Sequence, residues 1–370
     1  MEKIKAFLKR KDIVFTLQRY GIDALGAMAQ GLFCTLLVGT ILNTLGSQLG
    51  IGFLQRAIVT LKDATGENQI SYTIGGLASA LVGPAMAIAI GYALHCPTLV
   101  LFSLIPVGFA ANAMGGSGGP LSVYFIAIIA AEFGKAVSRE TKIDILVTPI
   151  VTILAGIGAS ALIAAPIGAA ATAVGDFVKW ATVLQPFWMG ILVSVVIGMA
   201  LTLPISSAAI CAALTLTGLA GGAAVAGCCA QMVGFAAMSF RENRWGGLVA
   251  QGVGTSMLQM PNIVKNPRIW IPPILASAIT GPLATCVFRL EMNGAPVSSG
   301  MGTCGFVGQI GVYTGWVNDV AGGAKAAVTG FDWLGLVLIC FVLPAVLSLI
   351  FGAVLRRIGW IRENDLKLDL

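Results

Sequence analysis

The sequence predicts an all-α polytopic membrane protein with about ten transmembrane helices and two re-entrant hairpins. Hydrophobic residues make up 57% of the 370 residues and charged residues only 10%, whereas an ordinary soluble domain carries about 25% charged residues. Most apolar residues fall in ten stretches that approach the roughly 20 residues needed to cross a bilayer. Two further segments are rich in glycine, hydroxyl and amide groups but carry little charge. A soluble chain of this length would divide into domains with charged surfaces, which are missing here.

The ten predicted spans form two groups of five. The first group comprises residues 23–48, 72–94, 97–115, 119–137 and 144–168. The second group comprises residues 184–203, 206–222, 224–240, 270–288 and 332–355. Residues 169–183 between the groups are rich in small side chains and suggest an interfacial connector. We therefore expect a first part over residues 23–168 and a second part over residues 184–355.

The positions of the basic residues predict the orientation of the chain. If the N-terminus is cytoplasmic, 17 of the 22 lysine and arginine residues lie on the cytoplasmic side. They fall in the N-terminal arm, the 135–142 loop, the 241–268 region and a tail over residues 356–370. Because lysine and arginine concentrate on the cytoplasmic side of cell membranes, an even number of spans with both termini inside fits best. The predicted location is a cell membrane, with both termini in the cytoplasm.

The first 22 residues combine six basic side chains with apolar ones such as Phe7, Val14 and Leu17. This composition is typical of an amphipathic helix that lies on an anionic membrane surface. The alternative is a partly ordered basic tail. The segment lacks a short apolar core followed by small residues, so it does not resemble a cleaved signal peptide.

The two weakly charged segments are residues 246–268, with the run GVGTSMLQMPN, and residues 291–320, with the run GAPVSSGMGTCGFVGQIG. Neither is apolar enough to span. Irregular backbone is tolerated at membrane depth only where protein buries it or where it lines a watery cavity. We therefore expect re-entrant hairpins whose tips reach toward the bilayer midplane. The alternative, a solvated loop, does not explain the low charge or apolar residues such as Met257 and Phe306.

These segments supply the candidate substrate-binding residues. They are Thr255, Ser256, Gln259 and Asn262 in the first hairpin, Ser299, Thr303 and Gln309 in the second, and Ser206 and Ser207 at a helix start. Polar stretches also occur at residues 41–50 and 111–120. Each stretch alone favours close helix packing through small residues, whereas all of them together favour a shared polar cavity. Interrupted helices of this kind bring chain ends and free backbone groups to a transported substrate.

Few ionisable groups lie inside the apolar segments. Glu132 precedes Lys135 by three residues, which predicts an ion pair on one helix face, and a coupling role for Glu132 is the alternative. The single histidine, His95, and the eight cysteines form no metal-binding or redox motif. Phosphate-loop and HExxH motifs are absent, and we predict no catalytic residue, metal or cofactor. No basic run interleaved with aromatic residues suggests nucleic-acid binding.

A set of motifs extends from about residue 24 to 355. They are GGSGGPLSVYFIAIIAAEFGK, TKIDILVTPIVTI, PISSAAI, GTSMLQMPNIVKNPRIWIPP and GMGTCGFVGQIG. In combination they resemble the stand-alone EIIC-like membrane proteins of the bacterial phosphotransferase system, in the PfoR-like branch. The resemblance implies a location in the inner membrane of a bacterium and the elevator architecture of the EIIC glucose superfamily. The first five spans would form a scaffold and a homodimer interface, and the later spans and both hairpins would form a moving transport part.

The sequence departs from sugar-phosphorylating relatives at one motif. They carry an acidic residue in a hairpin motif such as GITEP, whereas this chain has Gln259, Met260, Pro261 and Asn262, with no histidine near. We therefore expect a permease for a small, polar, sugar-like solute without fused phosphorelay domains. Whether phosphorylation accompanies transport, through cytoplasmic phosphotransferase proteins, stays open. The alternatives are a solute-binding sensor that acts on a cytoplasmic regulator, and a carrier of a small organic anion that would use Arg289 and Lys325.

Overall fold

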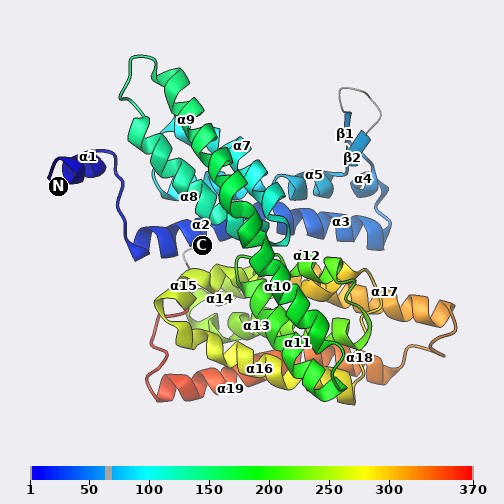
Figure 1. The fold of residues 1–370 in the computed structure, drawn as a ribbon. Coiled ribbons are helices and arrows are strands. Elements are labelled where there is room, and N and C mark those ends of the chain that lie inside the picture. Colours follow the sequence, from blue (N-terminus) through cyan, green and yellow to red (C-terminus); the bar gives the residue numbers. More distant parts are fainter. Residues whose placement is uncertain (1, 63–68, 369–370) are drawn as a thin grey trace. The chain divides into compact units, whose positions relative to one another are not determined.

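The computed structural model describes residues 2–62 and 69–368, and these residues are largely helical (Figure 1). The chain divides into two compact units, Met1–Gly168 and Ala169–Leu370. Within the described ranges, six helices are long and apolar enough to cross a membrane, and a bent helix pair could be a seventh. A further apolar helix, Pro186–Thr202, is shorter.

The first unit begins with a short helix, α1, and one long apolar helix with two π-helical segments. The bounds are α1 Glu2–Arg10, η1 Gln18–Ala24, α2 Leu25–Leu32, η2 Phe33–Leu37, α3 Val38–Leu49 and α4 Gly52–Gln55. Strands β1 (Val59–Lys62) and β2 (Gln69–Tyr72) then pair antiparallel, with Val59 opposite Tyr72. The polar stretch at 41–50 serves packing in this unit, because Asn43 Oδ1 accepts a 2.7 Å hydrogen bond from the Thr73 hydroxyl.

The rest of the first unit consists of packed helices. They are α5 Ile74–Ala80, α6 Val82–Ala93, α7 Thr98–Gly115, η3 Gly116–Gly118, α8 Gly119–Val137, α9 Asp144–Ala159 and η4 Ser160–Ala164. Helices α5 and α6 form the bent pair, with an angle of 52°. Helices α7 and α8 turn at Gly116, whose φ of 53° and ψ of −123° suit only glycine. Gly115 faces Ser122 and Gly134 faces Val100, so the two helices run antiparallel.

Helix α9 continues through η4 into α10 (Ala165–Ala181) without a break, forming a helix of 38 residues. Residues 169–181, in which the sequence suggested an interfacial connector, are therefore helical.

The second unit contains nine further α-helices within the described residues. They are α11 Pro186–Thr202, α12 Ser207–Ala213, α13 Gly218–Met238, α14 Phe240–Val249, α15 Met260–Lys265, α16 Ile271–Pro282, α17 Val307–Ala321, α18 Gly330–Val337 and α19 Leu343–Arg357. Helices α18 and α19 join through η11 (Leu338–Val342) into one apolar helix of 28 residues.

The expectation of separate spans at 206–222 and 224–240 is wrong. Helix α12 has only seven residues, and one helix, α13, accounts for most of the remaining stretch. The chain breaks between them because Thr215 and Gly218 have φ angles of 48° and 63°, which no right-handed helix accommodates.

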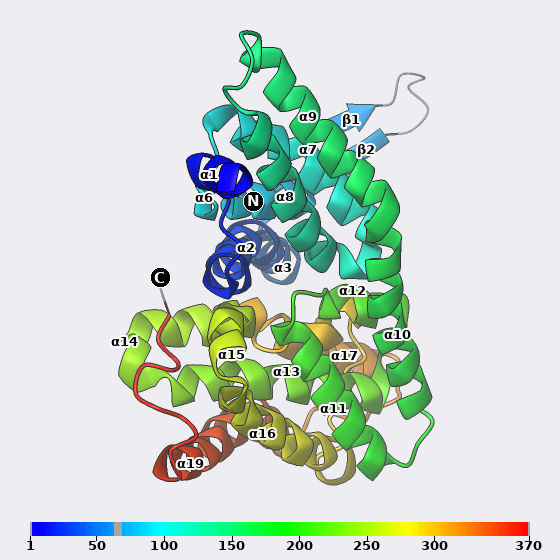
Figure 2. The ribbon, with the colours of Figure 1, turned by 60° about the vertical axis from the view of Figure 1, so that its left-hand side comes forward.

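Helix α13 is the central helix of the second unit, and α11, α16 and α19 pack against it (Figure 2). Two thirds of its residues are glycine, alanine or cysteine, and most of the helix is buried. A Cβ on Gly222 would lie 1.6 Å from the Leu290 carbonyl oxygen, and one on Gly227 would lie 1.8 Å from that of Ser194. Small side chains therefore let neighbouring backbones approach α13 closely.

The first helix of the N-terminal arm ends at Arg10 and helix resumes at Leu17, so the amphipathic helix expected over residues 3–20 is interrupted. The helix ends where Asp12 has a positive φ of 52°. Asp12 then fixes the arm: its carboxylate accepts two hydrogen bonds from the Arg19 guanidinium, at 2.9 and 2.6 Å. The Lys135 ammonium donates to the Asp12 carbonyl at 2.6 Å and to the Leu94 carbonyl at 3.1 Å.

Glu132 and Lys135 form the ion pair that their spacing predicts, with 3.2 Å between Lys135 Nζ and Glu132 Oε2. The Tyr20 hydroxyl donates to Glu132 at 2.9 Å. His95 lies in the turn after α6, and its Nδ1 is 3.5 Å from the Asp12 carboxylate. These contacts give Glu132 a structural role, and a coupling role for it stays a prediction.

We expect Asp12→Asn to loosen the arm. Hydrogen bonds from Arg19 lower the pKa of Asp12 from 3.8 to about 2. Because the pKa is lowered by folding, this stabilisation is complete above pH 3.8 and is lost as the pH falls toward 2. The carboxylate is half exposed, so the loss should be about 1 kcal/mol or less.

Hydrogen exchange of residues 2–16 at neutral pH measures this effect, and it should accelerate by about five-fold at most. The control is Asp23→Asn, which removes an exposed carboxylate bonded to Gln18 rather than to a cation. Equal exchange rates in the two variants would contradict the assignment.

Candidate functional site

Hairpin 1, the name kept here for residues 246–268, is a chain of short helical segments that is interrupted at Thr255. After α14 come η5 (Ala250–Gly254), η6 (Ser256–Gln259), α15 and η7 (Pro267–Trp270). Thr255 itself is extended, with φ −155° and ψ 142°. Every residue from Gly254 to Met260 is buried. The protein itself buries this irregular backbone, which argues against a solvated loop and supplies partners for its polar groups.

Hairpin 2, residues 291–320, passes through η9 (Pro296–Gly300) and η10 (Cys304–Phe306) before it enters α17. Three residues near its tip, Gly302, Gly305 and Phe306, have φ between 51° and 58°. A left-handed conformation at a residue as bulky as phenylalanine is uncommon and concentrates at functional sites. Both hairpins pack on α13, and η10 of hairpin 2 contacts η5 of hairpin 1. The η5 segment of hairpin 1 and the η10 segment of hairpin 2 therefore meet beside α13.

Ser256 belongs to a buried polar network that joins hairpin 1 to the helices around it. Its hydroxyl lies 2.8 Å from the Thr202 hydroxyl, which is 3.3 Å from Gln231 Oε1. The Trp270 indole N–H also donates to Gln231 Oε1, at 2.8 Å. The sequence analysis did not single out Thr202, Gln231 or Trp270. A lone amide in the apolar run GCCAQMVG of α13 was the signal for Gln231.

Gln259 and Asn262 lie in a chain of amide side chains. Gln259 Nε2 donates to Gln251 Oε1 at 2.8 Å, and Asn262 Nδ2 donates to Gln259 Oε1 at 2.8 Å. Each also donates to a carbonyl of the C-terminal tail, Gln259 to Leu366 at 3.0 Å and Asn262 to Lys367 at 2.8 Å. Both side chains are buried, and each NH₂ group already uses both of its hydrogens.

Thr255 and three serines make local or bracing hydrogen bonds. Thr255 accepts from the Met257 N–H at 3.2 Å, and Ser206 caps α12 by accepting from the Ala209 N–H at 3.2 Å. The Ser207 hydroxyl donates to the Gly300 carbonyl at 2.7 Å. The Ser299 hydroxyl donates to the Leu216 carbonyl at 2.7 Å. Ser207 and Ser299 therefore hold hairpin 2 against α12 and the start of α13.

Thr303 and Gln309 differ from these residues because their partners are sulfur atoms. The Thr303 hydroxyl donates to Met232 Sδ at 3.5 Å, and Gln309 Nε2 donates to Cys229 Sγ at 3.2 Å. Gln309 Oε1 is buried and has no hydrogen-bond partner among residues 2–62 and 69–368. Thioether and thiol sulfur are weak acceptors, so both side chains retain hydrogen-bonding capacity that the protein does not use. They have the chemistry to bind an uncharged ligand with hydroxyl groups.

The titratable side chains of the described residues do not gather into a metal site. Across residues 2–62 and 69–368, no three His, Cys, Asp or Glu side chains come together as a metal ion would need. The adjacent Cys228 and Cys229 are both buried free thiols that pack within α13.

A family model described as "Phosphotransferase system, EIIC" matches residues 22–368, nearly the whole chain. No curated protein and no solved structure matches the chain. The family match and the helical spans confirm the predicted all-α membrane fold. The chain therefore belongs to the EIIC family of the phosphotransferase system, as a multi-pass protein of the cell membrane that serves transport of sugar-type solutes.

Proposed function

We propose that the chain is a permease for a small, uncharged, sugar-like solute and carries it by elevator-type alternating access. The observation that carries this proposal is the pair Thr303 and Gln309, which are buried beside α13 and whose hydrogen-bond partners in the described part of the chain are sulfur atoms. An unsatisfied buried polar group costs about 1–3 kcal/mol. A solute hydroxyl that donates to Gln309 Oε1 would recover that cost, and a second hydroxyl oxygen could replace Met232 Sδ as the acceptor for Thr303.

The other candidate residues have supporting parts in this proposal. Ser256, Gln259 and Asn262 of hairpin 1 supply further hydroxyl and amide groups to the solute when their present partners move away. Ser206, Ser207, Ser299 and Thr255 fix the two hairpins. All nine candidate side chains are uncharged, which favours a neutral solute over an ion.

The charges near hairpin 2 do not favour the organic-anion alternative. The Lys325 ammonium is 2.6 Å from the Asp332 carboxylate and also lies over the Trp316 ring. Its charge is therefore already neutralised by a carboxylate. Arg289 lines a cavity of about 430 Å³ together with Gln185 and Thr285, and none of the nine candidate residues lines that cavity.

The proposal also includes the arrangement in the membrane. The first unit would be the scaffold and homodimer interface, the second unit would move, and both termini would be cytoplasmic. Apolar side chains exposed along α9 and η4 support a lipid or subunit contact for that helix. They include Ile145, Leu146, Ile150, Leu154 and Leu162. The lysine and arginine distribution supports the orientation.

Purified protein in sealed vesicles tests the function. A thermal-shift screen against sugars, polyols and organic acids first identifies a ligand, because a ligand that binds only the folded protein raises its melting temperature. We then expect solute-specific flux across the vesicle membrane, and no sugar phosphate when the phosphorylated carrier protein of the phosphotransferase system is added as phosphoryl donor. Binding without flux would favour the sensor, and flux that depends on solute charge would favour the anion carrier.

A further inference from the structure

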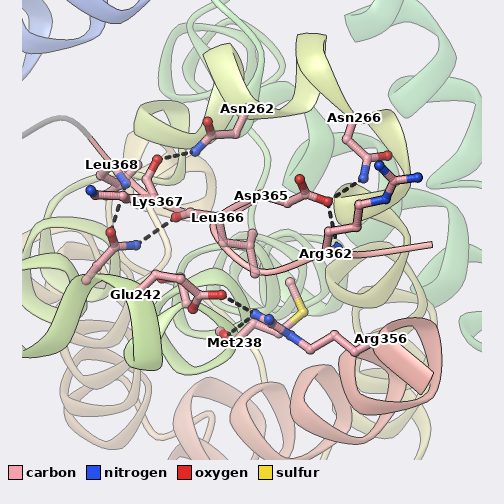
Figure 3. Close-up of polar contacts among 12 residues, drawn as sticks. Met238, Glu242, Asn262, Asn266, Arg356, Arg362, Asp365, Leu366, Lys367 and Leu368 are labelled. Atoms are coloured by element: carbon pink, nitrogen blue, oxygen red, sulfur yellow. Dashed lines mark hydrogen bonds and ion pairs between the residues drawn. The ribbon is translucent and has the colours of Figure 1, made fainter. Parts of the chain in front are cut away.

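The last residues of the described chain fold back onto hairpin 1 instead of extending away from it (Figure 3). Helix α19 ends in a tight reversal at Gly359, whose φ is 77°. The Gly359 N–H donates to the Arg356 carbonyl at 3.1 Å and the Trp360 N–H to the Leu355 carbonyl at 2.9 Å. These paired hydrogen bonds form a Schellman motif, which stops the helix and redirects the chain. Residues 360–368 are called the strap from here on.

Asn243, in α14, recognises the strap by its main chain. Asn243 Nδ2 donates to the Leu366 carbonyl at 2.8 Å, and Asn243 Oδ1 accepts from the Leu368 N–H at 2.8 Å. One side-chain amide thus pairs with the carbonyl of one residue and the N–H two residues later, as a neighbouring β-strand would. The Leu366 carbonyl also accepts from Gln259 at 3.0 Å, so two donors converge on it.

Hairpin 1 supplies three more side-chain amides to the strap. Gln259 and Asn262 each direct one N–H to the rest of the amide chain and the other to a strap carbonyl. Asn266 Nδ2 donates to the Trp360 carbonyl at 2.9 Å and to the Asp365 carboxylate at 2.8 Å. With Asn243, four amide side chains from residues 243–266 hold the strap.

Apolar burial anchors the same segment. Leu366 is fully buried and Ile361 is 2% exposed. The Arg268 guanidinium lies 5.2 Å from the centre of the Trp360 ring. At the base of the strap, Arg356 pairs with Glu242 at 2.6 Å, which fixes the end of α19 to α14 (Figure 3). Main-chain pairing combined with apolar anchors is how proteins bind an extended peptide, and a solvated basic tail would have neither.

We propose that the docked strap restrains hairpin 1 in its present position. Undocking of the strap frees the N–H groups of Gln259 and Asn262 that it now occupies, and it lets hairpin 1 move. The Schellman motif at Gly359 separates the strap from α19, so the strap can leave without unwinding that helix. The proposal rests on the proposed function only where it makes the freed N–H groups available to a solute. The restraint on hairpin 1 is a property of the fold.

The test is peptide-resolved hydrogen exchange on the full chain in lipid nanodiscs, comparing wild type with Leu366→Asp. A charge at this fully buried position should expel the strap. We expect residues 360–368 and residues 250–266 to exchange at least ten times faster, while α13 stays as protected as in wild type. The control, Lys367→Ala, changes an exposed side chain and keeps the carbonyl that Asn262 uses, so it should match wild type.

Faster exchange in the strap with no change in residues 250–266 would overturn the proposal, because the strap would then be a passive tail. If Leu366→Asp also raises exchange in α13, Asn243→Ala decides, since it removes two hydrogen bonds to the strap and leaves the strap sequence intact. Faster exchange in residues 250–266 of that variant supports the strap, and unchanged exchange overturns it.

Flux separates this proposal from the proposed function. Faster solute flux in Leu366→Asp than in wild type supports the release of hairpin 1 into transport, and unchanged flux overturns that part. If neither protein moves any solute although residues 250–266 exchange faster in the variant, the permease fails while the restraint on hairpin 1 stands.

Discussion

Replacement of Gln309 by leucine is expected to weaken solute binding by about 10- to 100-fold while the protein remains folded. Leucine fills a similar volume but cannot pair with a solute hydroxyl, and leaving such a group unpaired in a buried site costs about 1–3 kcal/mol. The folded protein itself loses little, because Gln309 Oε1 has no partner and Nε2 has only Cys229 Sγ. The dissociation constant of the ligand found in the thermal-shift screen measures the effect.

Two further variants make this test specific. Thr303→Val removes the hydroxyl that donates to Met232 Sδ and should weaken binding in the same direction. Gln55→Leu is the matched control, because Gln55 bonds to the Gly46 carbonyl in the first unit and lies outside the proposed site. An unchanged dissociation constant in Gln309→Leu would show that the solute does not contact this residue.

Gly222→Val should prevent the second unit from folding. A Cβ at Gly222 would lie 1.6 Å from the Leu290 carbonyl oxygen, so backbone would have to move. Overpacking in a well-packed core costs about 1–3 kcal/mol and occasionally more, and this contact with rigid backbone should lie at or above the upper end. We expect a large fall in melting temperature or loss of the purified protein.

Gly158→Val in α9 is the control for that prediction. No atom lies within 4 Å of a Cβ placed at Gly158, so valine has open space there. Its melting temperature should stay close to that of wild type. If Gly222→Val melted at the same temperature as Gly158→Val, the close approach of α13 to the Leu290 backbone would not be required for folding.

The sequence predicts the helices well where glycine and proline mark their ends. The expected spans at 97–115 and 119–137 match α7 and α8 within a residue or two, because a cluster of glycines and Pro120 breaks the apolar pattern there. The same approach failed over residues 206–240. Hydropathy cannot distinguish two spans from a short helix followed by one long one, and only the backbone angles at Thr215 and Gly218 decide.

The polar character of the two hairpins is visible in the sequence, but the partners of their side chains are not. Gln259 and Asn262 bond to main-chain carbonyls of Leu366 and Lys367, more than 100 residues away. Every residue has a carbonyl, so no side-chain pattern could indicate those acceptors. Gln231 was within reach of sequence reasoning, because an amide in the middle of a buried helix requires a partner.

The crowding along α13 restricts where this chain can change. At Gly222 and Gly227 the neighbouring backbones leave no room for any side chain, so we expect substitutions there to remove the fold rather than alter its chemistry. Under the proposed function, a change of cargo would therefore arise from side chains borne on the two chain reversals, which can be exchanged one at a time while the helix behind them stays constant.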